Sequence, residues 1–566
     1  MAPSSDDCGW LLYLSLAAKC GDPHRLLGLA AVFAAAFLLT ALLHWASPGG
    51  PAWGWYWWAR KAGLGIITGG AAVIPGPRGL PVLGSMGLMT GLAHRKLAAA
   101  AAKGDKAARR RLMAFSLGET RVVVTADPDV ARELLASAAF ADRPVKESAY
   151  GLLFHRAIGF APHGAYWRSL RRVATNHLFS PRQVAASAAQ RAAIARQMVS
   201  AAMEGGSSGG GGVTTTTMPR RFLKRASLHN VMWSVFGRRY ELLAGGEEAA
   251  ELKSLVDEGY DLLGQLNWSD HLPWLARFDL QRTRARCAAL VPRVNRFVGR
   301  IIDEHRACAV AGDDSSAAAA AAAAVTDFTD VLLSLQGADK LSDADMIAVL
   351  WEMIFRGTDT VAVLMEWVLA RLVLHQDVQS RVHEELDRVV GPGRAVTESD
   401  TASLVYLQAA IKEVLRLHPP GPLLSWARLA TSDVHVGGFL VPAGTTAMVN
   451  MWAITHDPAV WSDPEEFKPE RFVSGGSSDH AAGDEFSVMG SDLRLAPFGS
   501  GRRSCPGKSL AMATVGFWLA TLLHEFKWLP VSDEDLTRGV DLSEVLRLSC
   551  EMAVPLEARL VPRRAA

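Results

Sequence analysis

The sequence lacks paired cysteines, a metal-binding histidine motif and an excess of charge of either sign. Its six cysteines, at positions 8, 20, 287, 308, 505 and 550, show no zinc or disulfide spacing, which is consistent with a reducing environment. Its 16 histidines form no H-E-x-x-H motif. With 59 basic and 57 acidic residues the net charge is +2, so the composition gives no indication of nucleic-acid binding.

One short segment carries more chemical information than the rest of the chain. In residues 497–507, Cys505 lies between two glycines, Gly501 and Gly507, and follows Phe498. Glycines allow a tight turn around the sulfur, with backbone N–H groups directed at it, while a phenylalanine supplies an apolar wall. The pattern indicates a cysteine held as a ligand to haem iron.

The residues after this segment support the same interpretation. Residues 508–523 are mostly apolar with helical spacing, which places Cys505 near a helix N-terminus. The helix dipole there favours a negatively charged sulfur, and thiolate is the form that binds metals. The alternative is a buried structural cysteine, the usual role of a lone cysteine.

The pattern Phe498-x-x-Gly501-x-Arg503-x-Cys505-x-Gly507 resembles the haem-binding loop of the cytochrome P450 family. The resemblance implies haem b as cofactor, with Cys505 as the axial ligand of iron. It also implies a mainly α-helical cytochrome P450 fold with a small β-sheet region.

Two further motifs stand upstream in the order found in that family. Glu413 and Arg416 match its Glu-x-x-Arg helix, and residues 469–472 match its Pro-Glu-Arg-Phe stretch, which contains Arg471. The resemblance implies a buried network of Glu413, Arg416 and Arg471 behind the haem. Taken alone, the Glu-x-x-Arg pair could equally be an ion pair on a solvated helix face.

A long apolar run, residues 346–374, predicts a helix that the resemblance places across the distal face of the haem. The family pattern implies that Gly357 gives oxygen room there, and that Asp359 and Thr360 handle protons as catalytic residues. The pair favours monooxygenation. The alternative for Thr360 is a hydroxyl that only bonds the carbonyl one turn back.

Arg356 departs from the family, which usually has alanine or glycine at this position. It lies one turn before Thr360, on the same helix face. Two explanations compete: an intrahelical ion pair with Glu352, or a contact to a carboxylate or other oxygen-rich group of the substrate.

Four residues match family contacts around the haem propionates. Trp167 and Arg171 are spaced one helical turn apart, and Arg428 and Arg503 match two further contacts. Each arginine could instead be an ordinary surface residue. The planar guanidinium fork is suited to binding carboxylates.

The resemblance also places a substrate pocket along two stretches of the chain, with smaller contributions from segments around 143–160 and 255–280. Its apolar character suits a lipid-like molecule. The expected lining residues are Phe355, Arg356, Gly357, Leu423, Leu424, Ser425 and Trp426.

The N-terminal part, residues 1–74, is predicted to be a membrane anchor, and residues 75–566 the catalytic domain. Residues 26–43 carry no charge and suffice for a marginal single span, and aromatic residues within 45–58 are typical of a membrane interface. A cleaved signal peptide is the alternative. The resemblance implies an anchor in the endoplasmic reticulum with the catalytic domain in the cytosol. A proline-rich stretch, residues 75–81, resembles the family's stiff connection.

Elsewhere the pattern predicts long amphipathic helices, with short strands near 116–125, 434–440 and 446–450. A glycine-rich insert within 205–212 and an octa-alanine at 317–324 are interpreted as exposed loop expansions without chemistry.

Within the family, the chain is most similar to the plant subfamily 78A. The supporting residues are 355–360, 421–428 and the tryptophan-rich N-terminal extension. This implies hydroxylation of a fatty acid or related lipid, with O2 as co-substrate, and a role in plant organ and seed growth. No flavin or nicotinamide motif is found, so electrons must come from a partner, NADPH-cytochrome P450 reductase, for which Arg502 and Lys508 are candidate contacts. The alternatives are a haem-thiolate isomerase or dehydratase, and a non-catalytic haem sensor.

Overall fold

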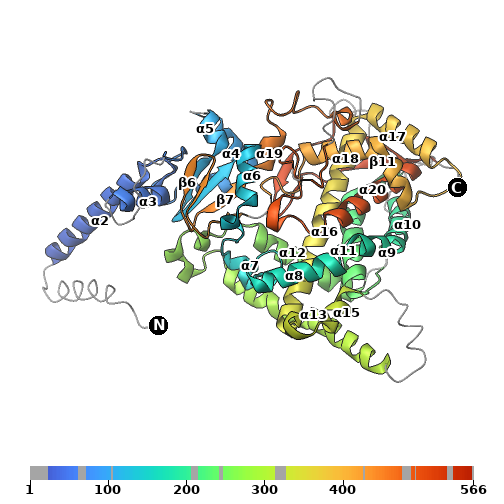
Figure 1. The fold of residues 1–566 in the computed structure, drawn as a ribbon, viewed down its shortest axis with the longest axis horizontal. Helices are drawn as coiled ribbons and strands as arrows, with labels where there is room; N and C mark the ends of the chain where they lie inside the picture. The colour runs from blue at the N-terminus through green and yellow to red at the C-terminus, as the bar shows by residue number, and fades with distance from the viewer. Residues whose placement is uncertain are drawn as a thin grey trace.

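The structure is a computed structural model, and it is mainly helical with several small sheets (Figure 1). The glycine-rich insert and the octa-alanine lie outside the residues that it describes. The described residues are 23–61, 72–103, 106–204, 215–240, 242, 246–312, 327–424, 427–473, 486–490, 492–531 and 539–563.

The helices account for about half of the described residues. They are α2 (Pro23–Trp45), α3 (Pro51–Lys61), α4 (Ala93–Ala101), α5 (Lys106–Arg111), α6 (Pro128–Ala136), α7 (Glu147–Gly151), α8 (Ala165–His177), α9 (Pro181–Ala186), α10 (Ala188–Glu204), α11 (Pro219–Phe236), α12 (Glu247–Gly264), α13 (Thr283–Gly312), α15 (Phe328–Ser334), α16 (Asp343–Leu374), α17 (Gln376–Val389), α18 (Val405–Leu417), α19 (Met451–Thr455) and α20 (Lys508–Glu525).

Within the described residues the strands are short and form four sheets. They are β1 (Met113–Leu117), β2 (Thr120–Thr125), β3 (Thr215–Thr217), β4 (Arg428–Leu429), β5 (Val434–Val436), β6 (Phe439–Val441), β7 (Thr446–Val449), β8 (Phe526–Leu529), β9 (Glu544–Leu546), β10 (Cys550–Met552) and β11 (Ala558–Pro562).

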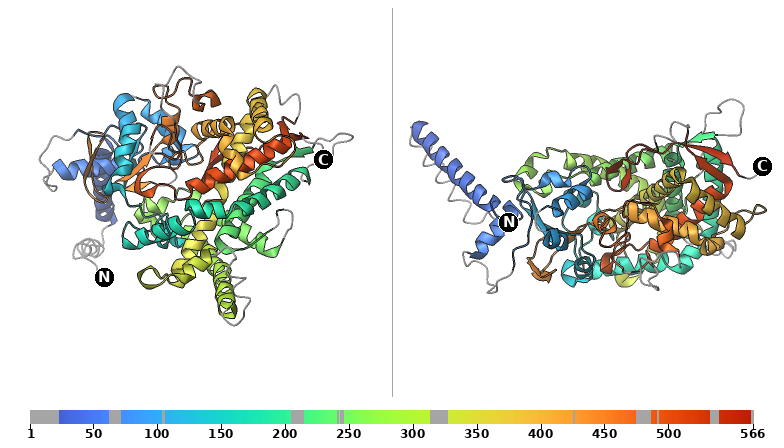
Figure 2. Two further views of the ribbon diagram at one scale, coloured as in Figure 1. Left: turned by 45° about the vertical axis from the view of Figure 1, so that its right-hand side comes forward. Right: turned by 90° about the horizontal axis from the view of Figure 1, so that it is seen from above.

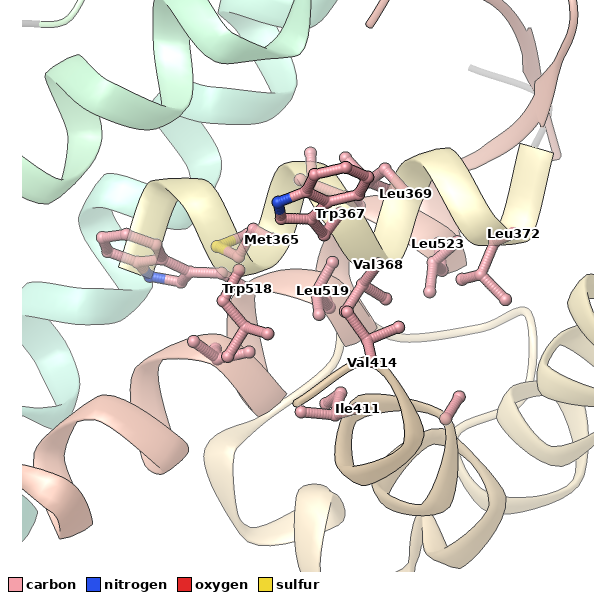
Figure 3. Close-up of a cluster of buried hydrophobic side chains, with 14 of the residues drawn as sticks. Met365, Trp367, Val368, Leu369, Leu372, Ile411, Val414, Trp518, Leu519 and Leu523 are labelled. Carbon is pink, nitrogen blue, oxygen red and sulfur yellow. The ribbon is translucent and has the colours of Figure 1, made fainter. Parts of the chain in front are cut away.

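The centre of the core is the packing of α16 against α18 and α20 (Figure 3). Helix α16 begins after Ser342, whose hydroxyl accepts the N–H of Asp345 as an N-cap. Its second half is apolar on nearly every side, which requires neighbours all around it. The side chains in contact include Met365, Trp367, Val368, Leu369, Leu372, Ile411, Val414, Trp518, Leu519 and Leu523.

The largest sheet has the strand order β1-β2-β7-β4, with β2 and β7 parallel and the other neighbours antiparallel. The expected strand at 116–125 is instead the end of one strand, a turn and a second strand, because Gly118 adopts a φ of 52° and reverses the chain. The expected strand at 434–440 is likewise a hairpin, which turns at Gly437 and Gly438. The hydrophobic pattern alone did not locate these turns.

Two further sheets involve the C-terminal part of the chain, and the sequence pattern gave no prediction for them. One has the order β3-β11-β8, and the other is the antiparallel hairpin of β9 and β10. Leu548 and Ser549 lie between the two strands of this hairpin and line the main cavity described below.

The two N-terminal helices differ in how they pack against the rest of the molecule. Helix α2 extends away from the body of the molecule, whereas α3 lies against the β1-β2 end (Figures 1 and 2). Within the described residues, no helix combines the length and apolar composition that crossing a membrane requires. The interpretation of residues 45–58 as interfacial aromatics is wrong for Trp53, which is fully buried and donates its indole N–H to the carbonyl of Phe115. Trp55 and Trp58 are exposed.

Candidate functional site

A single cavity of about 310 Å³ brings together the motifs that lie far apart in the sequence. Its wall contains the middle of α16, the segment before α20, the chain between α18 and β4, and one residue of α8. Expected site residues found in this wall are Phe355, Arg356, Gly357, Asp359, Thr360, Leu423, Leu424, Arg171, Arg428, Phe498, Arg503, Cys505 and Gly507.

Cys505 lies in the turn immediately before α20, and its backbone N–H donates to the carbonyl of Phe498 at 2.9 Å. Gly501 is required in this turn because its φ is 70° and a Cβ would lie 2.0 Å from the carbonyl oxygen of Leu135. Gly507 packs under Phe179, where a Cβ would lie 3.1 Å from the ring. The glycine positions therefore reflect close packing as well as access to the sulfur.

The thiol of Cys505 experiences opposing influences. Burial raises its pKa, while a hydrogen bond from the backbone of Gly507 and the charges of Arg356, Arg171 and Lys508 act in the opposite direction. The net direction is upward in the protein alone. A cation at the sulfur would favour the thiolate, as metal coordination does.

Three of the expected propionate contacts lie together beside this turn. The guanidinium of Arg503 donates to the carbonyls of Ala141, Ile158 and Ala161. Arg171 donates to the carbonyl of Ser504 at 2.5 Å. The distance from Arg428 to the carbonyl of Ser500 is 3.4 Å, which is a weaker contact.

Trp167 supports this cluster from behind. Its ring centroid lies 4.2 Å from the guanidinium carbon of Arg503, and its indole N–H donates to the carbonyl of Ile158 at 2.9 Å. The contact is a cation–π interaction in a buried location, which fixes the plane of the guanidinium. Trp167 therefore acts on the site through Arg503.

A fourth buried arginine, Arg143, belongs to the same cluster and was missed by the sequence interpretation. It donates to the carbonyls of Gly159 and Ala427, at 3.2 and 3.0 Å. Burial and the charges of Arg428, Arg503 and Arg356 hold its pKa well below the usual range. The residue follows no recognisable motif, so only a broad expectation for the segment 143–160 pointed to it.

The buried arginines beside Cys505 show whether this site suits the charges of a haem. Burial and the neighbouring arginines lower the pKa of Arg428 to about 9, and burial is the main cause of a pKa of about 10 for Arg503. Arginines whose charged form is disfavoured in this way would be stabilised by nearby anions. The two carboxylates of a haem supply those charges beside the cysteine that would bind its iron, so the residues fit the group.

Helix α16 presents a polar stretch to the cavity. Thr360 is exposed and lines the cavity, while Thr358 is buried and donates its hydroxyl to the carbonyl of Ile354 at 2.6 Å. Of these two threonines, Thr358 thus makes a bond to the preceding turn. Gly357 also lines the cavity, and a Cβ there would lie 2.5 Å from a methyl group of Val231 in α11. Glycine thus permits close approach of the two helices.

The carboxylate of Asp359 is largely buried and lies 3.1 Å from the ammonium of Lys224. The same ammonium lies 2.9 Å from the carboxylate of Glu551 in β10. Asp359 therefore reaches the cavity while held by a charge network that comes from α11 and from the C-terminal hairpin.

Arg356 lines the cavity close to the buried carboxylate of Glu352. That carboxylate accepts the N–H of Gly159 at 2.8 and 3.0 Å. Burial raises the pKa of Glu352, and the charge of Arg356 is the largest influence that lowers it. Arg356 thus acts on the Glu352 carboxylate through its charge and also lies in the cavity wall, so both explanations for Arg356 stay open.

The apolar wall agrees in part with the expected substrate pocket. Phe355, Leu423 and Leu424 line the cavity, whereas Ser425 and Trp426 lie outside the described residues. The ring of Phe355 stacks on Tyr260 with centroids 4.2 Å apart. Wall residues that the sequence did not single out include Leu134, Asn230, Val231, Tyr260, Leu548 and Ser549.

The expected network of Glu413, Arg416 and Arg471 is present in the described residues. Arg416 and Glu413 are fully buried and joined by two N–H to oxygen contacts of 2.8 Å. The Nε atom of Arg471 lies 3.3 Å from Oε1 of the same carboxylate, an oxygen that Arg416 also contacts. The N–H of Lys468 also donates to it at 3.0 Å. The network joins α18 to the segment containing η8 (Pro469–Phe472).

Comparison with known proteins gives concordant results. A family model described as Cytochrome P450 matches residues 74–549. The chain is 60% identical to "Cytochrome P450 78A9" of Arabidopsis thaliana over 557 residues, 98% of each chain. It is 60% identical to "Cytochrome P450 78A6" of Arabidopsis thaliana over 529 residues, 93% of each chain. It is 56% identical to "Cytochrome P450 78A3" of Glycine max over 564 residues, 100% of each chain.

Proposed function

Because this chain belongs to the cytochrome P450 family, whose members are haem-thiolate monooxygenases, we propose that it hydroxylates a small apolar substrate, a fatty acid or a related lipid. The observation that carries the proposal is that Cys505, Thr360 and the apolar side chains of Phe355 and Leu423 all line one cavity. A mainly apolar cavity with a few convergent polar groups is typical of a site for such molecules.

Four residues are proposed to hold the haem. The sulfur of Cys505 would bind the iron, and Arg171, Arg428 and Arg503 would bind the two carboxylates; all four residues line the cavity. A thiolate-ligated haem, when bound, supplies the activation of O2 for insertion of one oxygen atom into a substrate C–H bond. The protein contributes the sulfur, the charges and the shape of the cavity.

Two residues of α16 are proposed to manage protons. The hydroxyl of Thr360 lines the cavity and would donate and accept hydrogen bonds there, and the carboxylate of Asp359 would pass protons toward it from the side of Lys224. The apolar wall formed by Phe355, Leu423 and Leu424 excludes water from the reacting region.

Electrons are proposed to come from NADPH through a cytochrome P450 reductase. Arg502 is exposed beside the cysteine turn, and Lys508 is half-buried at the start of α20. Their side chains donate to the carbonyls of Ala136 and Met489. Cations near the sulfur suit the docking of an acidic partner surface.

Residues 1–74 are proposed to attach the protein to the membrane of the endoplasmic reticulum, with residues 75–566 as the catalytic domain in the cytosol. The support is the exposed apolar surface of α2, and attachment would be tested by alkaline extraction of microsomes and by protease protection. The exposed side chains are Leu27, Val32, Phe33, Phe37, Leu38, Leu39, Leu42 and Leu43.

A role in plant organ and seed growth is proposed from the similarity to the plant relatives. It would be tested in a plant that lacks its own copy. Restored organ size with the natural sequence but not with Cys505→Ala would support a catalytic role in growth, whereas rescue by both would contradict it.

The direct test of the chemistry is product analysis. Membranes that contain the protein and a plant reductase are incubated with NADPH and with free fatty acids or their esters, after the reduced carbonyl complex has shown a thiolate-type spectrum. Hydroxylated products are expected, with loss in Cys505→Ala and Thr360→Ala. The matched control is Thr358→Ala, because that hydroxyl bonds within the helix and its loss leaves product formation largely intact.

The other outcomes separate the alternatives. No product from correctly loaded protein would remove fatty acids as the substrate class. Turnover of an oxidised substrate without NADPH or O2 would indicate an isomerase or dehydratase. A correct spectrum with no turnover of any apolar metabolite would favour a sensor.

A further inference from the structure

Lys224 of α11 is shared between two carboxylates that come from different parts of the chain. Its ammonium lies 3.1 Å from Asp359 of α16 and 2.9 Å from Glu551 of β10. Burial alone would lower the pKa of Lys224, but the two carboxylates outweigh burial and raise it, so the lysine stays charged. The ammonium of Lys224 is thus shared by two carboxylates. Each carboxylate weakens the interaction of the lysine with the other.

The strand that carries Glu551 is directly connected to the cavity wall. Leu548 and Ser549 line the cavity, and Glu551 follows two residues later in β10. A molecule lying against these residues therefore touches the same short hairpin that holds Lys224. On the other side, the carboxylate that shares the lysine, Asp359, faces the cavity itself.

Two other cations lie farther from the Glu551 carboxylate than Lys224 does. The guanidinium of Arg220 lies 4.0 Å away, and that of Arg547 lies 3.7 Å away on a largely exposed side chain. Exposed ion pairs contribute little, because solvent screens them. Among the described charges, Lys224 is therefore the main partner of Glu551.

We propose that Glu551 is a positioning residue for proton transfer at Asp359. By sharing Lys224, it keeps the Asp359 carboxylate out of a one-to-one ion pair and available to exchange protons. Contact of the substrate with the β9-β10 hairpin then changes how the lysine is divided between the two carboxylates. The inference rests on the proposed monooxygenase function and adds a residue outside the cavity wall to it.

The chain contains a matched control one helical turn earlier in α11. Arg220 lies 2.7 Å from the carboxylate of Glu366 in α16 and donates to the carbonyl of Met552 in β10, also at 2.7 Å. It therefore joins the same three elements as Lys224 does, but without a residue of the cavity wall. Arg220 also lies 4.0 Å from Glu551, so the control is Arg220→Lys, which keeps a positive charge there while it disturbs the contacts to Glu366 and Met552.

The test compares Glu551→Gln, Lys224→Met, the double variant and the control Arg220→Lys in the haem-loaded protein. Turnover is driven either by NADPH and the reductase, or by iodosylbenzene, which delivers one oxygen atom without electrons or protons. With NADPH, Glu551→Gln is expected to slow product formation about fivefold and to enlarge the solvent deuterium isotope effect. With iodosylbenzene at saturating substrate, its turnover stays at the natural value.

The double variant supplies the decisive comparison, because Glu551 acts through the lysine. In the Lys224→Met background, Glu551→Gln should change the isotope effect no further. The control Arg220→Lys should leave the isotope effect unchanged. Equal losses in the two assays, or an effect of Glu551→Gln that persists without Lys224, would overturn the proposal and leave Glu551 a structural residue.

A measurement without turnover separates this proposal from the proposed function. The natural sequence, the two single variants and the double variant are compared in urea unfolding. The effects of Lys224→Met and Glu551→Gln on the free energy of unfolding should be non-additive, because the residues share a contact. Additive effects would overturn the sharing of the lysine. Absence of product from the natural sequence in both assays, with non-additive unfolding, would instead count against the monooxygenase function.

Discussion

Replacement of Arg416 by leucine tests how strongly burial governs an ion pair in this protein. Arg416 and Glu413 are three residues apart in α18, and both are fully buried. Arg132 and Asp129 have the same spacing in α6, with exposed fractions of 56% and 82%. The two pairs differ mainly in burial, so Arg132→Leu is the matched control.

The expected magnitude follows from what the substitution leaves behind. Arg416→Leu removes two charge-assisted hydrogen bonds and leaves the Glu413 carboxylate buried. Breaking a buried pair in this way costs about 3–5 kcal/mol. Two groups still contact the carboxylate, Arg471 at 3.3 Å and the N–H of Lys468 at 3.0 Å. They moderate the loss.

The arginine also has acceptors of its own. It donates to the carbonyls of Thr455, Pro464 and Glu466, at 2.8, 2.7 and 3.1 Å, and these lose their donor in the variant. We therefore expect a loss of about 4 kcal/mol in the free energy of unfolding. Arg471→Leu should cost about 1–2 kcal/mol, because its bond to Glu413 is longer.

The assay is urea unfolding of the haem-loaded protein, followed by tryptophan fluorescence and by the thiolate-type absorbance of the reduced carbonyl complex. The expected order of loss is Arg416→Leu, then Arg471→Leu, then Arg132→Leu, which should change the stability little. Equal losses for Arg416→Leu and Arg132→Leu would refute the reasoning, as would a larger loss for Arg471→Leu than for Arg416→Leu.

Three other predictions follow from individual contacts. Arg356→Ala should weaken binding of free fatty acids relative to their methyl esters if Arg356 contacts a substrate carboxylate; if it only pairs with Glu352, both affinities should change equally in spectral titrations. Burial lowers the pKa of His229 to about 4, below the value of about 6.5 for an unfolded chain, so the unfolded state binds more protons and stability falls as the pH drops from 6.5 toward 4. Between pH 7 and 5, the free energy of unfolding should fall by about 2 kcal/mol less in His229→Phe than in the natural sequence. An unchanged pH dependence in urea unfolding would contradict this. Trp53→Ala should cost about 3–5 kcal/mol because the side chain is buried and hydrogen-bonded, whereas Trp55→Ala should change unfolding little; similar results for the two would count against a core role for Trp53.

The site was predictable wherever chemistry demands a fixed local spacing. The turn around Cys505 needs glycine at 501 because of a positive φ and a close carbonyl, so the motif is visible in the sequence. Glu413 and Arg416 are three residues apart in one helix, so their spacing alone places them on the same helix face. Helix α16 was predicted over most of its length, since its apolar run is long and uninterrupted.

Other features depended on contacts between distant segments. Arg143 has no motif, and its place among the arginines is set by the carbonyls of Gly159 and Ala427. Trp53 has the same local surroundings as Trp55, but only Trp53 packs on the sheet. Neither distinction is visible in local spacing, because both arise from which segments fold against each other.

Local spacing in the sequence was enough to identify the turn around Cys505, the helix that carries Asp359 and Thr360, and the family, because each rests on residues close together in the chain. Which residues surround those groups depended instead on how distant segments pack together. This packing placed the N–H of Gly159 against the Glu352 carboxylate, and it brought Glu551, nearly two hundred residues after Asp359, to the same lysine. The physical reason is that a buried charge must find its partner in space, and the fold supplies that partner from whichever segment packs against it.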